Sequence, residues 1–159
     1  MQPLPPALTA KDIMATKLVT LSPDADVFEA IGVLLKHKIS GCPVVDRDGR
    51  LLGLFSEKSC MQVVIDAAYE QLPTNHVETF MIRSPQTIDE QTDLLSMAQI
   101  FLSTSRRRLP VLRDGIVVGQ VSRRDVIRAA HQMLIVEKQD KTPPLYLSAL
   151  REMDEAPDV

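Results

Sequence analysis

The chain has 159 residues, of which 45% are hydrophobic and 25% are charged, and its formal net charge at pH 7 is -3. This composition excludes a disordered chain and predicts one ordinary domain or two small subdomains that share a core. The acidic balance argues against a general nucleic-acid-binding protein, and no apolar stretch reaches the roughly 20 residues needed to span a membrane. The start of the chain lacks the anatomy of a signal peptide, so we expect a cytoplasmic protein.

The residue types that carry catalysis or bind metals form no recognisable pattern. Cys42 and Cys60 lie in apolar surroundings and form no C-x-x-C pair, which favours two small buried side chains over a disulfide or a metal site. His37, His76 and His131 show no ligand spacing. There is no nucleophile and base pair, P-loop or dinucleotide-binding glycine motif, so an enzyme is the least favoured class.

The first half of the chain predicts a strand followed by a helix. Residues 1–10 are rich in proline and predict an extended lead-in, and residues 18–21 are a short strand candidate. Asp26 is a good helix N-cap, with Glu29 at the capping-box position. The helix that follows has one apolar stripe at i, i+3, i+4, i+7 and i+8, which consists of Val27, Ala30, Ile31, Leu34 and Leu35.

A hairpin and a second helix complete this half. Residues 42–45 and 51–55 read as two strands joined by an Asp/Gly turn, and Ser56 can cap the next helix. That helix is apolar over most of its circumference, through Cys60, Met61, Val63, Val64, Ile65, Ala67 and Ala68. A surface this wide needs a partner, which is either the other half of the chain or another subunit.

The pattern then starts again after a linker at residues 71–76. Four landmarks recur at an interval of 67 residues: Met14 and Met81, Thr20 and Thr87, Asp26 and Asp93, and Pro43 and Pro110. The second turn is one residue shorter, so Gly119 and Ser122 stand 66 residues after Gly53 and Ser56. The chain therefore reads as two units, 11–70 and 77–136, each with a strand, a helix, a hairpin and a helix.

The stretch from Gly119 to Asp125 has two interpretations. Ser122 and Asp125 match a capping box, which many helices carry only to satisfy their own first turn. The same first turn offers free N–H groups and the positive end of the helix dipole to an anion, and Arg123 and Arg124 add positive charge. Both interpretations stay open on these residues alone.

Two other segments have plainer interpretations. The basic run Arg106 to Arg108 is interpreted as the solvated end of a helix. Residues 137–159 begin with a polar break, after which apolar residues suggest a short amphipathic helix, namely Leu145, Tyr146, Leu147, Leu150 and Met153. This tail either docks onto the body of the protein or binds a partner.

Taken together, the repeated motifs resemble a tandem pair of CBS domains, the Bateman module. The resemblance covers residues 11–135 and is carried by the Met-x5-Thr pattern, the capped helix, the Pro-Val strand, the Asp/Gly turn and Gly-x-x-Ser-x-x-Asp. It implies an α/β (α+β) fold in which two β-α-β-β-α units pack about a pseudo-twofold axis. It also implies clefts for AMP, ADP, ATP or S-adenosylmethionine, and no catalysis by the module itself.

The resemblance assigns roles to particular residues of the second unit. Asp125 would bind the ribose hydroxyls and Ser122 would lie near the phosphate. Thr87, Arg108 and Pro110 would line the same cleft. Arg123 and Arg124 add charge that favours an anion there.

The first unit departs from this pattern. Ser59 stands where the carboxylate should be, and Glu57 brings a negative charge to the place of Arg123. A neutral hydroxyl makes weaker hydrogen bonds to ribose than a carboxylate does. We therefore expect a weaker second cleft, which would involve Thr20, Pro43, Ser56 and Ser59.

The expected function is a nucleotide-sensing regulatory module that requires no cofactor and acts on an unidentified partner protein. The alternative is a ligand-free dimerisation or docking module, which keeps Ser122 and Asp125 only as a cap. In either case the apolar second helices predict a homodimer. We expect neither a membrane nor a nucleic acid as a partner.

Overall fold

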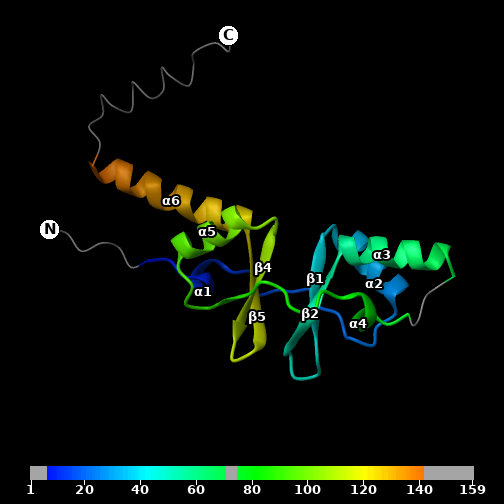
Figure 1. Cartoon of the computed structure of the whole chain (residues 1–159). Helices are drawn as coiled ribbons and strands as arrows, with labels where there is room; N and C mark the ends of the chain where they lie inside the picture. Colours follow the sequence, from blue (N-terminus) through cyan, green and yellow to red (C-terminus); the bar gives the residue numbers. More distant parts are fainter. Residues whose placement is uncertain (1–6, 71–74, 142–159) are drawn as a thin grey trace, which may run out of the picture.

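The computed structural model describes residues 7–70 and 75–141, and side chains as far as residue 135. Two halves lie side by side, with a β-hairpin of each half at the centre and the helices around them (Figure 1). The elements in chain order are α1 (Ala10–Ile13), α2 (Val27–His37), β1 (Gly41–Val45), β2 (Leu51–Ser56), α3 (Glu57–Ala68), α4 (Val77–Phe80), β3 (Ile88–Asp89), α5 (Leu94–Ser103), β4 (Arg108–Arg113), β5 (Ile116–Ser122) and α6 (Arg123–Lys141). The mixed α+β architecture confirms the predicted fold class.

The predicted cap of the first long helix is present. The Asp26 carboxylate accepts the backbone N–H groups of Phe28 at 2.8 Å and Glu29 at 3.2 Å, which satisfies two free donors of the first turn of α2. Asp93 caps α5 in the same way, since it accepts the Ser96 N–H at 2.7 Å. Helices α2 and α5 both begin where the sequence predicts.

The strands form two small sheets. In the first, β1 pairs antiparallel with β2; in the second, β3 runs parallel to β4, which pairs antiparallel with β5. The strand predicted at residues 18–21 is wrong, because only Leu21 forms a bridge, to Val44. Pro23 follows closely and has no N–H to donate, so the pairing cannot continue past Ser22.

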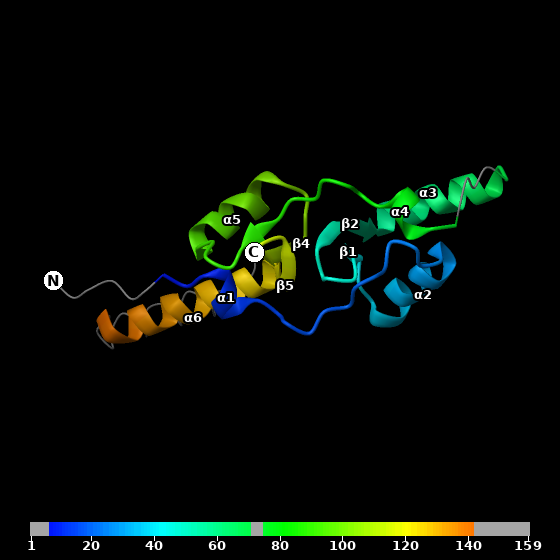
Figure 2. The ribbon, with the colours of Figure 1, turned by 90° about the horizontal axis from the view of Figure 1, so that it is seen from below.

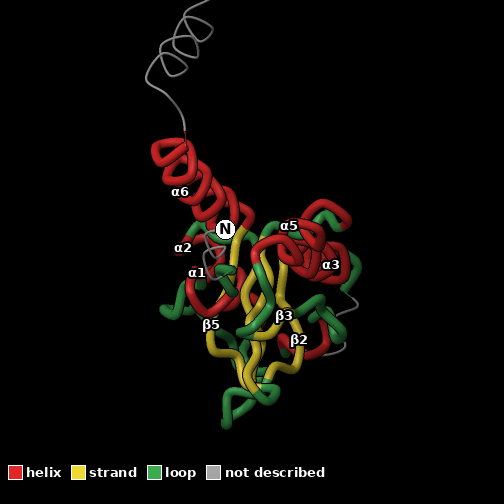
Figure 3. The backbone as a smooth tube through the Cα atoms, turned by 90° about the vertical axis from the view of Figure 1, so that its left-hand side faces the viewer, coloured by secondary structure: helices red, strands yellow, loops and turns green. Residues whose placement is uncertain are grey.

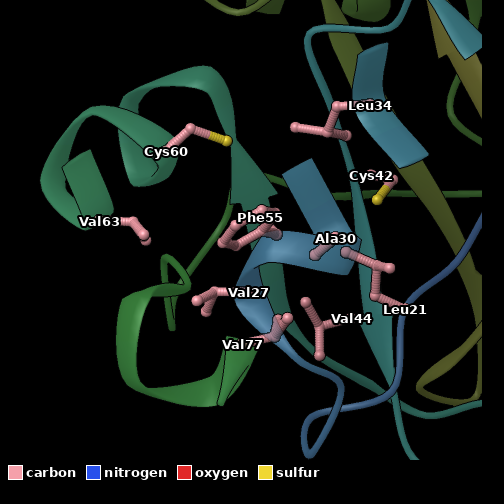
Figure 4. Close-up of a cluster of buried hydrophobic side chains, with 10 residues drawn as sticks. All are labelled: Leu21, Val27, Ala30, Leu34, Cys42, Val44, Phe55, Cys60, Val63 and Val77. Carbon is pink, nitrogen blue, oxygen red and sulfur yellow. The ribbon is translucent and has the colours of Figure 1, made fainter. Parts of the chain in front are cut away.

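Each half has its own apolar core. In the first core, Val27, Phe55, Val63 and Val77 are fully buried between α2, β2, α3 and α4 (Figure 4). The second core includes Met97, Leu109, Val111 and Val121, together with Ala10 from the start of the chain. The chain therefore crosses between the halves, and Ala10 begins a helix although the sequence placed it in an extended lead-in.

The two halves exchange short segments. Helix α1 packs against α6 and β5 of the second half, and α4 packs against α3 and β2 of the first half (Figure 2). The exchange has a matching bridge on each side, Ala15 with Gln120 and Ile82 with Leu54. The ends of the two hairpins also meet, since Leu51 N–H donates to Gly115 O at 3.1 Å and Val117 N–H donates to Gly49 O at 3.0 Å. Figure 3 shows these turns at the end of the molecule opposite α6.

Some predictions concern residues near the limits of the described chain. Helix α6 continues to Lys141, so the polar break predicted after residue 137 does not end it. The predicted tail helix at residues 145–153 and most of the predicted linker lie outside the described residues. None of the described helices is both long and apolar enough to cross a membrane. The boundaries 11–70 and 77–136 stay predictions.

Gly53 lies where the exchanged segment around Ile82 packs tightly against β2. A Cβ at Gly53 would lie 2.6 Å from the backbone oxygen of Ile82, which cannot move aside as a side chain can. We expect Gly53→Ala to lower the free energy of unfolding by about 1–3 kcal/mol in urea titrations. Gly32 is the matched control, because it lies within α2 and a Cβ added there would have nothing within 4 Å. Gly32→Ala should raise stability by up to about 1 kcal/mol, and equal effects of the two changes would contradict the packing.

The buried thiol of Cys42 makes the free energy of unfolding depend on pH in the alkaline range. Burial raises the pKa of the Cys42 thiol from its ordinary value of 9.0 to about 12, and the neighbouring Cys60 adds to this effect. Between pH 9 and 12 the folded state keeps the proton of this thiol and the unfolded state loses it. The contribution of the protonated thiol to the free energy of unfolding is therefore complete below pH 9 and is lost as the pH rises from 9 to 12. Within that window the wild type should lose about 1.4 kcal/mol more per pH unit than Cys42→Ala in urea titrations. Parallel pH profiles of the two proteins would show that this thiol does not titrate as its burial requires.

Candidate functional site

The sequence Ser122 to Asp125 forms a complete capping box at the start of α6. Asp125 Oδ2 accepts the Ser122 N–H at 2.8 Å, and Ser122 Oγ accepts the Asp125 N–H at 3.1 Å. The other carboxylate oxygen, Oδ1, lies 3.4 Å from Arg128 Nη1, and 21% of the side chain is exposed. The capping interpretation is therefore confirmed, but each carboxylate oxygen keeps room for another donor.

The first half has a neutral version of the same box at the start of α3. Ser56 N–H donates to Ser59 Oγ at 3.2 Å, and Ser59 N–H donates to Ser56 Oγ at 3.3 Å. Ser59 is only 5% exposed. The two halves therefore build the same turn, but only the second half places a carboxylate in it.

A pocket of about 280 Å³ lies beside Asp125, and we call it the Asp125 pocket. Asp125, Ser122, Gln120 and Arg108 line it from the second half. The other lining residues precede the second half in the sequence: Ala15, Lys17, Leu18, Val19, Ile39, Gly41 and Cys42. The pocket exists because the segment after α1 leads from the second half to the first, so residues far apart in the sequence line the same pocket.

A larger pocket of about 800 Å³ adjoins it, and we call this the arginine pocket. Its apolar wall comes from α2 and the first turn of α3, and includes Leu34, Leu35 and Met61. Its charged residues are Lys38, Glu57, Arg107, Arg108, Arg123 and Arg124. Figure 1 shows α3 and α6 starting near the centre and running in opposite directions, so both helix N-termini lie at this pocket.

Arg123 is held in place by the main chain. Its guanidinium donates to Arg106 O at 2.8 Å and to Thr104 O at 3.1 Å, both beyond the end of α5. Because α5 ends at Ser103, the prediction that residues 106–108 form the solvated end of a helix is wrong. The run instead leads into β4, and Arg108 lines both pockets.

Most of the predicted site residues are distributed over three neighbouring pockets. Ser122, Asp125 and Arg108 share the Asp125 pocket, while Arg123 and Arg124 line the arginine pocket. Pro43, Ser56 and Pro110 line a third pocket of about 80 Å³ between the two hairpins. Thr20, Ser59 and Thr87 line none of the three.

Several lining residues were not predicted. Lys17, Leu18 and Val19 line the Asp125 pocket, whereas the predicted Thr87 does not. Lys38 and Arg107 add positive charge to the arginine pocket. The basic run in the sequence could have indicated Arg107 as a site residue. Residues 17–19 line the Asp125 pocket only because the two halves exchange segments, and no local sequence pattern indicates this.

No metal centre is formed by the described residues, since no group of three His, Cys, Asp or Glu side chains could hold an ion. The burial that raises the pKa of Cys42 also keeps its thiol protonated at neutral pH. Cys42 is thus an apolar part of the wall of the Asp125 pocket.

Comparison with known proteins identifies the repeat. The family model of the CBS domain matches residues 10–66 and 77–132. The crystal structure of CBSX2 from Arabidopsis thaliana in complex with AMP is 30% identical, with a TM-score of 0.71 over 79% of this chain and 98% of that chain. The CBS domain pair of MJ0100, in complex with 5-methylthioadenosine and S-adenosyl-L-methionine, is 26% identical, with a TM-score of 0.65 over 80% of this chain and 99% of that chain.

Two of the curated relatives are longer proteins. The chain spans 15% of the A-adding tRNA nucleotidyltransferase of Aquifex aeolicus, at 29% identity over 127 residues, and 65% of CBSX1 of Arabidopsis thaliana, at 31% identity over 153 residues. The nucleotidyltransferase is therefore matched only over a small part of its length. The family model matches both repeated units of this chain. The chain therefore belongs to the CBS domain family, as a pair of CBS domains.

Proposed function

We propose that the chain is a regulatory module that binds an adenosine nucleotide in the Asp125 pocket and transmits the bound state to a partner protein. The observation that carries this proposal is the convergence of Asp125, Ser122 and Arg108 on one pocket, together with residues that precede the second half in the sequence. The likeness to CBS pairs whose structures hold AMP or S-adenosyl-L-methionine supports the same ligand class. The proposal includes no chemical step.

The pocket has a suitable part for each part of a nucleotide. Leu18, Val19 and Ile39 offer an apolar surface for the base. Asp125 can accept hydroxyl groups of the ribose with the lone pairs that the capping box leaves free. Ser122 and Arg108 lie where this pocket meets the arginine pocket, so the phosphate would point toward the positive charge.

The first half is proposed to contribute a weaker site or none. Its box uses Ser59, which is buried and neutral, and Glu57 lies in the arginine pocket at the start of α3. Thr20, Pro43 and Ser56 do not share one of these pockets with Ser59. The charge of the two helix starts therefore favours binding at the second half.

We further propose that the module forms a homodimer. Large apolar side chains are exposed at equivalent positions of both halves: Phe28 and Leu95, Leu35 and Leu102, Met61 and Ile127, and Tyr69 and Ile135. A surface that repeats across a pseudo-twofold axis suits an isologous contact, in which the same patch meets itself. Such a contact would also cover the outer faces of α3 and α6.

A ligand-free docking module remains the second candidate. It is favoured by the capping boxes, which show that Ser122 and Asp125 already have a structural role. The two candidates differ in whether the Asp125 pocket has affinity for nucleotides.

Asp125→Ala separates these functions by calorimetry with ADP or ATP. Loss of a charged hydrogen-bond acceptor should weaken binding by about 1.5–3 kcal/mol, which is roughly a 10- to 150-fold rise in Kd. The change also removes a cap, so Asp93→Ala serves as the control, because Asp93 caps α5 and lines none of the pockets. Both variants should lose about 1 kcal/mol of stability, but only Asp125→Ala should lose affinity.

Two outcomes would contradict this assignment. Equal nucleotide affinity of Asp125→Ala and wild type would make Asp125 a cap only. Strong binding at a second site in Ser59→Asp would show that the missing carboxylate alone disables the first half. We expect no such site, because the new charge would be buried beside Glu57.

The homodimer is tested with charges on the apolar faces of α3 and α6. Ile65 and Leu134 are 52% and 57% exposed, and Ile65→Glu with Leu134→Glu should shift the protein to a monomer in sedimentation velocity experiments. Gln62→Glu is the control, since it adds a charge to an exposed polar position of α3 and should leave a dimer. A wild type that sediments as a monomer at high micromolar concentration would rule out the proposed assembly.

A further inference from the structure

The arginine pocket carries far more positive charge than one phosphate group requires. Five basic side chains line it, Lys38, Arg107, Arg108, Arg123 and Arg124, against the single acidic side chain of Glu57. Four of the five come from the second half, because the first half has Ile39, Ser40 and Gly41 at the positions equivalent to residues 106–108. This concentration of charge is a property of this chain and does not follow from the repeat.

The basic side chains are not neutralised by the protein. Within the described part of the chain, the ion pairs join Arg113 to Glu90 and Arg128 to Asp125, and neither includes a residue of the arginine pocket. Arg123 donates to backbone carbonyls, which fix its position but leave its charge. Cations that line one pocket repel one another, and a bound polyanion would reduce that repulsion.

The arginine pocket adjoins the Asp125 pocket. Ile39, Arg108 and Ser122 line both, so a ligand that is seated at Asp125 and extends past these residues would reach the arginine pocket. The arginine pocket, at about 800 Å³, is also the larger of the two, since the Asp125 pocket has a volume of about 280 Å³. A nucleoside fits the first pocket, and the second pocket offers room and charge for a longer anionic chain.

On the basis of the proposed function, we infer that the ligand is an adenosine di- or triphosphate, whose polyphosphate occupies the arginine pocket. AMP would leave most of the basic side chains without a partner. S-adenosylmethionine would bring a positively charged sulfonium group toward them, so it should bind poorly. Glu57 is the one acidic residue lining the pocket, and the five basic side chains can neutralise the phosphates without a divalent ion.

The test is calorimetry of the full chain in EDTA with ATP, ADP, AMP, adenosine, S-adenosylmethionine and inorganic tripolyphosphate. ATP should bind at least about tenfold more tightly than AMP, and its affinity should fall steeply as salt rises. Tripolyphosphate alone should bind and should compete with ATP. Lys38→Gln and Arg124→Gln should each weaken ATP by about tenfold and change AMP by less than about twofold.

Arg47→Gln is the matched control, because Arg47 is exposed in the turn after β1 and lines neither pocket. It should leave every affinity unchanged. Equal affinities for AMP and ATP, or tighter binding of S-adenosylmethionine, would overturn this inference and leave the proposed function standing. If tripolyphosphate binds but none of the adenosine compounds does, or if none of the six compounds binds, both this inference and the proposed function are overturned.

Discussion

Both apolar cores and the candidate site depend on the exchange of short segments between the two halves. Neither core is complete without a residue from beyond its own half, since Ala10 is buried in the second core and Val77 in the first. The exchange also brings backbone into close contact, and Gly53 is required where Ile82 approaches. The same crossing brings residues 17–19 and Asp125 to one pocket, so the packing that closes the cores also builds the candidate site.

Against this symmetric framework, the two copies have diverged in charge. Both begin their last helix with a reciprocal serine box, but one contains Ser59 and Glu57 and the other contains Asp125 and Arg123. A capping box requires only an acceptor at its third position, and either side chain satisfies that need. The divergence therefore changes little in the fold and much in the electrostatics of the pockets, which is the pattern expected of a module with one dominant ligand site.

Sequence reasoning succeeded where the signal is local and failed where it depends on tertiary contacts. The caps at Asp26 and Ser122, the hairpins and the repeat interval could be predicted, because each is determined by neighbours within one turn or by the duplication itself. The other residues that line the Asp125 pocket could not, since residues 17–19 reach it only after the chain crosses between halves. The basic run at residues 106–108 resembled a solvated helix end, because no local pattern shows that its side chains line a pocket.

The proposed function rests on the binding of an adenosine nucleotide at the Asp125 pocket of the second half. This binding can be followed residue by residue by NMR, when ¹⁵N-labelled protein is titrated with ADP and the backbone amide signals are recorded. We predict that the signals of Ser122, Asp125 and residues 17–19 shift together, saturate, and change more than those of Ser56 and Ser59. Shifts centred on Ser56 and Ser59, or no saturable shift at millimolar nucleotide, would contradict the proposed site.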